Sequence, residues 1–177
     1  MFYNVLNYPS SDDTKADTLK RIVDYTHPDL LMLTEITSAD AVDLLLEDAL
    51  NTDGETAWES APFIDGPDTD NLLLYKSTLF TLVESNPIST NLRDINEYVL
   101  YLNASTTLDT AFLYVYVSHL KSGNSSENAM QRTLEATVLK NYIDERTAGE
   151  HFIISGDFNV YGASENAYQT LLINAHR

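Results

Sequence analysis

The stretch HFIISGDFNVYG, residues 151–162, decides how the rest of the chain is interpreted. The apolar residues Phe152 to Ile154 run into Gly156, and two oxygen-bearing side chains, Asp157 and Asn159, follow with one residue between them. A short apolar run bounded by a turn residue is typical of a buried strand. Ligands gather at the carboxyl ends of strands, where loops and backbone groups converge. The stretch therefore predicts a functional site at one end of a sheet.

The same pattern recurs at three other predicted strands, each of which carries a polar residue that the strand does not need. They are the first strand with Asn4 and Asn7, the second ending at Glu35, and a later one ending at His119. If these ends share one rim with Asp157, the rim holds two carboxylates, amides and an imidazole.

This set of side chains suits a hard divalent cation, because Mg²⁺ takes oxygen ligands from one or two carboxylates, waters and substrate phosphates. Glu35 is the expected direct ligand, and Asn4 offers an amide oxygen. We expect Asp157 and Asn159 to hold a water or a phosphate oxygen, and His119 to donate to phosphate or move a proton. The predicted chemistry is metal-assisted attack of water on a phosphate ester.

Each of these residues also has an ordinary structural interpretation. Asp157 and Asn159 would suit an Asx turn that closes a strand, Glu35 a solvated strand end, and His119 a strand-edge histidine. Only their joint placement favours a functional site.

The order of predicted elements is β-α-β-α, then several strands, then α-β-α, which indicates a single mixed α/β domain over residues 1–177. The predicted helices cover residues 14–26, a segment capped by Ser38, residues 126–144 and residues 164–172. In the third helix Met130, Leu134, Val138 and Tyr142 recur at i, i+4 spacing. The central strands are predicted over residues 56–63, 71–76, 79–85, 97–104 and 111–120, with a turn at Ser85–Pro87.

Composition restricts the possible functions. The net charge is −17 and there is no cysteine, which excludes disulfides, thiolate metal sites and a cysteine nucleophile. A non-specific basic nucleic-acid binder is disfavoured, although bound cations can reverse local charge at a phosphate site. No apolar run is long enough to span a bilayer. The acidic, cysteine-free composition slightly favours an exported protein, but the sequence carries no signal peptide to support that expectation.

Four segments together resemble the endonuclease/exonuclease/phosphatase superfamily, the group of deoxyribonuclease I. FYNVLNY resembles the first-strand motif with Asn4, and HPDLLMLTEI resembles the segment with the metal-binding glutamate, here Glu35. VSHLKSG resembles the strand that carries the first catalytic histidine, here His119. ISGDFNV resembles the GDFN motif, whose Asp157 and Asn159 lie at the scissile phosphate.

The resemblance implies a four-layer α/β/β/α sandwich and a phosphoesterase that depends on Mg²⁺ or Mn²⁺. It also implies that Arg93 and Asn7 contact substrate, and that Asp70 orients the first histidine. An imidazole needs such a partner to fix its tautomer.

The chain departs from the family pattern near its end. Family members carry a late Ser-Asp-His segment whose aspartate and second histidine activate water and bind metal. His176 follows an alanine and comes too soon after Asn159 to match it. We therefore expect a domain that is incomplete at the C-terminus, with apolar surface left uncovered.

Three functions are compatible with these residues. The first is a nuclease-like phosphodiesterase acting on a phosphodiester, with DNA or RNA as candidate substrates. The second keeps the fold but acts as a phosphomonoesterase or a sphingomyelinase-like lipid phosphodiesterase. The third is a non-catalytic remnant or half-domain that pairs with another chain.

Overall fold

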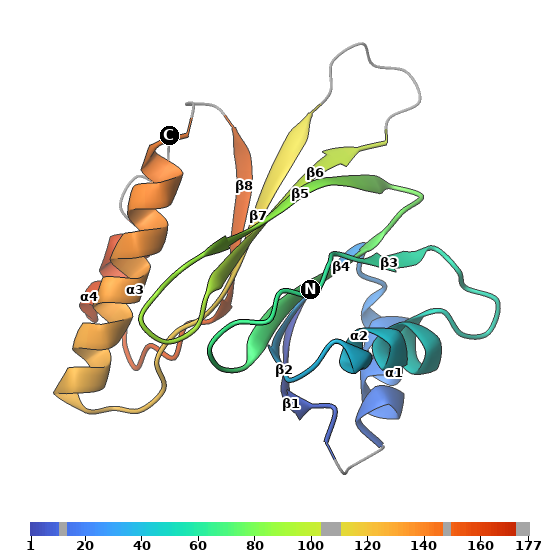
Figure 1. Ribbon diagram of the computed structural model, residues 1–177, viewed down its shortest axis with the longest axis horizontal. Helices are drawn as coiled ribbons and strands as arrows, with labels where there is room; N and C mark the ends of the chain where they lie inside the picture. Colours follow the sequence, from blue (N-terminus) through green and yellow to red (C-terminus); the bar gives the residue numbers. More distant parts are fainter. Residues whose placement is uncertain (11–13, 104–110, 147–149, 173–177) are drawn as a thin grey trace.

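The computed structural model describes residues 1–10, 14–103, 111–146 and 150–172. Two four-stranded sheets pack face to face, and a pair of helices covers the outer face of each (Figure 1). The α/β class and the predicted α/β/β/α layering are both confirmed. None of the described helices is long and apolar enough to cross a bilayer.

The first sheet is built from the N-terminal part of the chain, in the order β1-β2-β4-β3. Its strands are β1 (Phe2–Tyr8), β2 (Leu30–Ile36), β3 (Trp58–Ser60) and β4 (Asp70–Lys76). Its helices are α1 (Thr14–Thr26) and α2 (Asp40–Leu44), and α2 continues into the π-helical turn η1 (Leu45–Leu50). Because β1 and β2 are parallel, their carboxyl ends share one edge of the sheet.

The second sheet follows in simple chain order, β5-β6-β7-β8. Its strands are β5 (Phe80–Ile88), β6 (Ile95–Leu102), β7 (Phe112–His119) and β8 (His151–Asp157). Its helices are α3 (Ser126–Asp144) and α4 (Asn166–Leu172). Strands β7 and β8 are parallel, so His119 and Asp157 lie opposite each other at the ends of adjacent strands.

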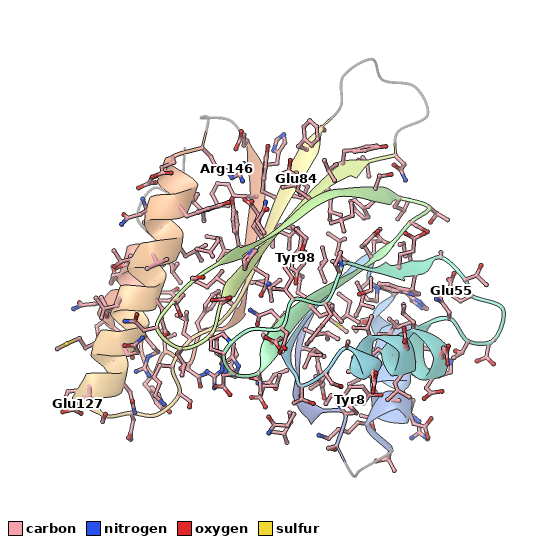
Figure 2. The ribbon with its side chains drawn as sticks, in the orientation of Figure 1. Tyr8, Glu55, Glu84, Tyr98, Glu127 and Arg146 are labelled. Carbon is pink, nitrogen blue, oxygen red and sulfur yellow. The ribbon has the colours of Figure 1, made fainter. Side chains whose placement is uncertain are left out.

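Three apolar layers hold the sandwich together, and strand alternation assigns each side chain to its layer. In β2, Leu31 and Leu33 pack under α1, whereas Leu30 and Met32 pack between the sheets. The inter-sheet layer also contains Tyr98, whose hydroxyl donates to the backbone oxygen of Asn71 at 3.2 Å (Figure 2). This buried bond links β6 of one sheet to β4 of the other.

Three of the four apolar residues whose spacing predicted α3 do not lie on its buried face. Met130, Leu134 and Val138 are 67, 51 and 36% exposed, whereas Arg132 and Leu139 are fully buried. The helix turns polar side chains inward because the loops beneath it present backbone groups that need hydrogen bonds, as described below.

Two predicted boundaries in the strand-rich part of the chain also differ. The predicted turn at Ser85–Pro87 lies inside β5, whose one partner among the described strands is β6, and Pro87 lies opposite Asn96. An edge strand accepts proline because the missing N–H would face outward. The predicted strand over residues 56–63 shortens to Trp58–Ser60.

The second helix does not use its predicted cap. It begins at Asp40 after Ala39, and the side chain of Ser38 makes no capping bond to it. Backbone bonds from Ala41 and Val42 to the carbonyls of Ser38 and Ala39 supply the first turn instead.

Strand β8 lies at the edge of its sheet among the described strands, with Phe152 38% and Ile153 37% exposed. That the domain is incomplete at the C-terminus stays a prediction. His176, the residue compared with the second family histidine, lies outside the described residues.

Candidate active site

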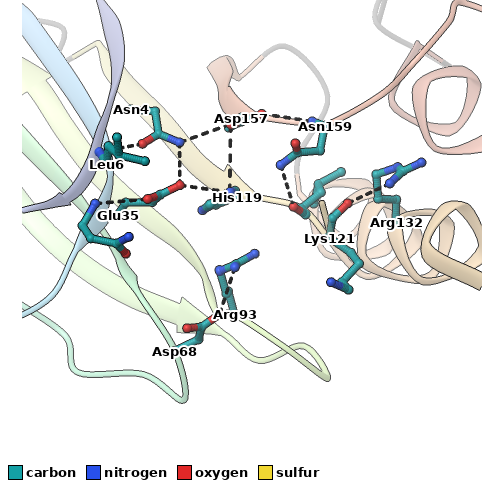
Figure 3. Close-up of polar contacts among 12 residues, drawn as sticks. Asn4, Leu6, Glu35, Asp68, Arg93, His119, Lys121, Arg132, Asp157 and Asn159 are labelled. Atoms are coloured by element: carbon teal, nitrogen blue, oxygen red, sulfur yellow. Dashed lines mark hydrogen bonds and ion pairs between the residues drawn. The ribbon is translucent and has the colours of Figure 1, made fainter. Parts of the chain in front are cut away.

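Four predicted site residues meet where the ends of β1, β2, β7 and β8 face each other (Figure 3). The Asn4 Nδ2 group donates to Glu35 Oε1 at 2.8 Å and to Asp157 Oδ2 at 3.2 Å. His119 Nε2 lies 3.8 Å from that Glu35 oxygen and 4.0 Å from that Asp157 oxygen. Each sheet supplies two of the four side chains, so the site lies between the sheets.

A bulge in β2 presents Glu35 to this site. The pairing of β2 with β4 shifts register between Thr34 and Ile36, and Glu35 has φ 67°. An extra residue in a strand re-aims a side chain, and left-handed backbone at a non-glycine residue is uncommon and concentrates at functional sites. Strict alternation would place Glu35 on the α1 face of the sheet, and the bulge turns it toward the opposite sheet.

The first strand is adapted in the same way. Leu6 and Asn7 have φ 52° and 54°, and the pairing of β1 with β2 is interrupted there. The backbone N–H of Asn7 donates to Glu35 Oε2 at 3.1 Å, and that of Leu6 donates to Asn4 Oδ1 at 2.8 Å. Asn4 therefore offers its Nδ2 group, not its oxygen, to the carboxylates. Asn7 contributes its backbone, whereas its predicted substrate-binding side chain is exposed.

Three close contacts made by Gly156, Asp157 and Asn159 explain the sequence of residues 151–162. Asp157 Oδ1 accepts from the backbone of Asn159 at 3.1 Å, and Asn159 Nδ2 donates to Leu120 O at 3.0 Å. Gly156 precedes Asp157 because a Cβ there would lie 1.8 Å from Ser118 O. Gly156 is thus required by the close approach of β8 to the backbone of β7.

His119 is almost completely enclosed, with its side chain 4% exposed. Burial lowers its pKa below the ordinary value, and the nearby Arg93 charge lowers it further, while Asp157 and Glu35 act in the opposite direction. Its Nδ1 has no hydrogen-bond partner among the described residues.

Arg93 lies beneath His119 on the segment that enters β6 (Figure 3). Its Nη2 pairs with Asp68 at 2.9 Å, whereas Nε and Nη1 are buried without partners in the described part of the chain. Two unpaired N–H-bearing nitrogens close to the carboxylate site are suitable donors to a phosphate oxygen.

Asp70 is not placed as predicted. Its carboxylate accepts from the backbone of Gly66 at 2.8 Å, and no hydrogen bond joins it to His119. Asp70 belongs instead to an acidic loop region with Asp65, Asp68 and Asp94. Burial raises its pKa to about 6, and those neighbouring charges contribute to the increase.

The structure adds a support that the sequence pattern did not indicate. Arg132, 1% exposed on α3, donates to Lys121 O at 2.8 Å and Gly123 O at 2.7 Å, and pairs with Glu165 at 2.5 Å. It joins the loop after His119 to the loop after β8, so it fixes both sides of the site. In the sequence, Arg132 lies between the apolar residues of a helical pattern. An arginine at such a position is equally typical of a solvent-exposed helix face.

The donor set fits a hard divalent cation. Two carboxylates, Glu35 and Asp157, converge on one amide, and Mg²⁺ usually binds one or two carboxylates plus waters and substrate. Among the described residues no three or more His, Asp or Glu side chains form a complete metal-binding group. Mg²⁺ held by Glu35 and Asp157 would take its remaining ligands from water or substrate, as it usually does.

A sequence profile of the endonuclease/exonuclease/phosphatase family matches residues 1–173. The chain belongs to the endonuclease/exonuclease/phosphatase family. Proteins of this family are generally hydrolases, and the order of the Asn4, Glu35, His119 and Asp157 motifs in this chain agrees with membership. A search of curated proteins finds no significant match.

Solved structures share the family fold at low sequence identity. Humanized TDP2 from D. rerio has a TM-score of 0.72 and 18% identity, and the match covers 96% of this chain and 64% of that one. The human nocturnin catalytic domain has a TM-score of 0.63 and 21% identity, covering 94% and 66%. A mannosyl-6-phosphatase from Bacteroides thetaiotaomicron has a TM-score of 0.68 and 15% identity, covering 97% and 68%. The chain thus spans about two thirds of these family structures.

Proposed function

We propose that this family member is a metal-dependent phosphoesterase that hydrolyses a phosphodiester, with DNA or RNA as the leading substrate class. The observation that supports it most is the convergence of Asn4, Glu35, His119 and Asp157 from four strands. A D. rerio TDP2 structure similar to this chain is a complex with a single-stranded DNA product.

Glu35 and Asp157 would hold Mg²⁺ or Mn²⁺ in this proposal. When bound, the cation supplies Lewis-acid polarisation of the phosphate and lowers the pKa of a water. Asn4 holds the two carboxylates together through its Nδ2 group, and the backbone of Asn7 fixes the second oxygen of Glu35.

The other side chains act on the phosphate and on protons. Asp157 and Asn159 orient the attacking water and a phosphate oxygen. The buried Nε and Nη1 of Arg93 donate to the phosphate. His119 donates from Nε2 to the phosphate or the leaving oxygen. Enclosure of this imidazole keeps bulk water from competing for its proton.

The test is nicking of supercoiled plasmid DNA in Mg²⁺ by the wild type and by Glu35→Gln. The substitution keeps the shape of the side chain and removes its charge, so we expect activity to fall by at least about 100-fold. Glu47→Gln, at an exposed position of η1, is the matched control and should nick at the wild-type rate. Full activity of Glu35→Gln would show that the assignment is wrong.

A phosphomonoesterase is the second candidate, because the net charge of −17 disfavours electrostatic steering of nucleic acid. The structural similarity to a mannosyl-6-phosphatase is consistent with it. A panel of plasmid DNA, RNA, sugar phosphates and sphingomyelin vesicles, assayed with Mg²⁺, separates this candidate and the sphingomyelinase-like alternative from a nuclease. A non-catalytic half-domain would hydrolyse none of them and would bind Mg²⁺ no better than an acidic surface does.

A further inference from the structure

Besides Nε and Nη1 of Arg93, three buried polar atoms on β2, β4 and β7 that face the layer between the sheets lack hydrogen-bond partners among the described residues. They are Thr34 Oγ1, Asn71 Oδ1 and His119 Nδ1. Thr34, Asn71 and His119 are 0, 1 and 6% exposed. Folded proteins rarely leave buried polar atoms unpaired, because such atoms lose their bonds to water without replacement.

These atoms come from one region between the sheets. Thr34 and Asn71 are direct cross-strand partners in β2 and β4, and both follow the alternation that points into the inter-sheet layer. Asn71 Nδ2 crosses to the second sheet and donates to Val117 O at 3.1 Å. His119 follows Val117 by two residues on the same face of β7, about 7 Å further along the strand.

The orientation of the Asn71 amide is fixed by its partners. Nδ2 donates to Asp94 O and Val117 O, and both are carbonyl oxygens that only accept. The Asn71 Oδ1 atom must therefore be an acceptor that needs a donor. Of the unpaired groups on the neighbouring strands β2 and β7, the Thr34 hydroxyl and the His119 imidazole face the same layer and can both donate.

We propose that Asn71 and Thr34 are the positioning residues of His119, holding its Nδ1 proton through one internal water. No direct hydrogen bond joins these groups, and a buried water typically bonds two to four polar atoms. Nδ1 then keeps its proton, and Nε2, which faces Glu35 and Asp157, is the nitrogen that gains and loses one. Its catalytic meaning rests on the function proposed above.

This arrangement replaces the expected carboxylate partner. Asp70 is adjacent in sequence to Asn71, but alternation along β4 places Asn71 between the sheets, and Asp70 bonds to Gly66 instead. A neutral amide and a hydroxyl can fix the imidazole tautomer without adding a negative charge beside the two site carboxylates.

The direct test is the tautomer of His119, read from side-chain ¹⁵N shifts of the labelled 177-residue chain in Mg²⁺ and alkaline buffer. His119→Asn assigns the signal. We expect the Nδ1–H form to dominate in the wild type and in Thr34→Ser, which keeps the hydroxyl. Thr34→Val and Asn71→Leu should shift the ring to a mixture of tautomers.

Ser118→Ala is the matched control. Ser118 Oγ is also buried and unpaired in the described chain, but alternation along β7 places it on the α3 face, away from Thr34. It should leave the tautomer unchanged. A dominant Nε2–H form in the wild type, or an unchanged ratio in Thr34→Val, would overturn the proposal. If Asn71→Leu does not fold, the comparison of Thr34→Val with Thr34→Ser tests the proposal by itself.

Hydrolysis of bis-p-nitrophenyl phosphate separates this inference from the proposed function. We expect Thr34→Val to lower kcat about tenfold with little change in KM, and Thr34→Ser to recover most of it. Loss of the tautomer preference with no hydrolysis by any form would support the positioning role and contradict the phosphoesterase. Normal kcat in a Thr34→Val protein whose tautomer has shifted would contradict a catalytic consequence.

Discussion

Asp70 shows how one buried carboxylate can oppose stability at neutral pH. It is 7% exposed, lies near Asp65, Asp68 and Asp94, and has its pKa raised from 3.8 to about 6. A raised pKa in an acid means that the folded state binds the proton more tightly than the unfolded state. The contribution of protonated Asp70 to the free energy of unfolding is full below about pH 4 and is lost as the pH rises through about 6.

We therefore expect Asp70→Asn to stabilise the protein at pH 7 by about 1–2 kcal/mol and to have little effect at about pH 4. Asn keeps the oxygen that accepts from Gly66 and removes the charge. Urea unfolding at both pH values measures the difference, with Asp43→Asn at an exposed position as the control. A variant that is less stable than the wild type at pH 7 would contradict this account.

The residue types of the site were predictable, but their local geometry was not. Glu35, His119 and Asp157 could be selected because each lies at the end of a strand-like segment, and Asn4 because it is a polar residue in the apolar first strand. The amino-acid sequence does not indicate the bulge at Glu35, because the left-handed φ of this residue is imposed by the strands on either side. The partner of the histidine was predicted as a carboxylate, whereas alternation along β4 brings an amide to the inter-sheet face.

At the scale of elements, α3 shows the limit of hydrophobic periodicity. The spacing correctly predicted a helix over residues 126–144, but its buried face contains Arg132 and Glu135. Glu135 accepts from the backbone of Lys121 at 2.9 Å, so both charged residues serve the loop after β7. Such a role depends on a loop that is distant in sequence, and an isolated helical pattern cannot reveal it.

Two leucines of α3 test which face is buried. Leu139 is 0% exposed and Leu134 is 51% exposed. We expect Leu139→Ala to cost about 2–5 kcal/mol in the free energy of unfolding and Leu134→Ala about 0.5 kcal/mol. Equilibrium unfolding in urea measures both. Equal losses would mean that the exposed stripe of Met130, Leu134 and Val138 is covered in solution.

At the scale of the whole molecule, 27 acidic and 10 basic side chains give a net charge of −17. Folding brings these charges closer together, so mutual repulsion disfavours the compact state. We expect the melting temperature at pH 7 to rise by several degrees between about 0.02 M and about 0.5 M NaCl, because salt shortens the range of the repulsion.

Thermal melts at pH 4.3, near the isoelectric point, provide the control and should depend much less on salt. A melting temperature that falls with salt at pH 7 would mean that local ion pairs, such as Lys20 with Asp24 and Asp53, outweigh the overall repulsion.

The layered fold followed from the sequence more completely than the site did. The order of apolar segments and turn residues predicts a mixed α/β domain whose sheets are covered by helices, because each apolar face must be covered. The four-layer arrangement was implied by the family resemblance. The length of β5 could not be predicted in this way, since a proline such as Pro87 ends most strands but is accepted at a sheet edge.

The hydrogen bond between Asn4 and Asp157 has a consequence for protein synthesis. It joins residues 153 positions apart, and it links the first strand of one sheet to the last strand of the other. A ribosome that has released the first sheet has released Asn4 and Glu35, but not their partners. No nascent chain that stops short of Asp157 can present the assembled site, so the site forms only after the second sheet has docked onto the first.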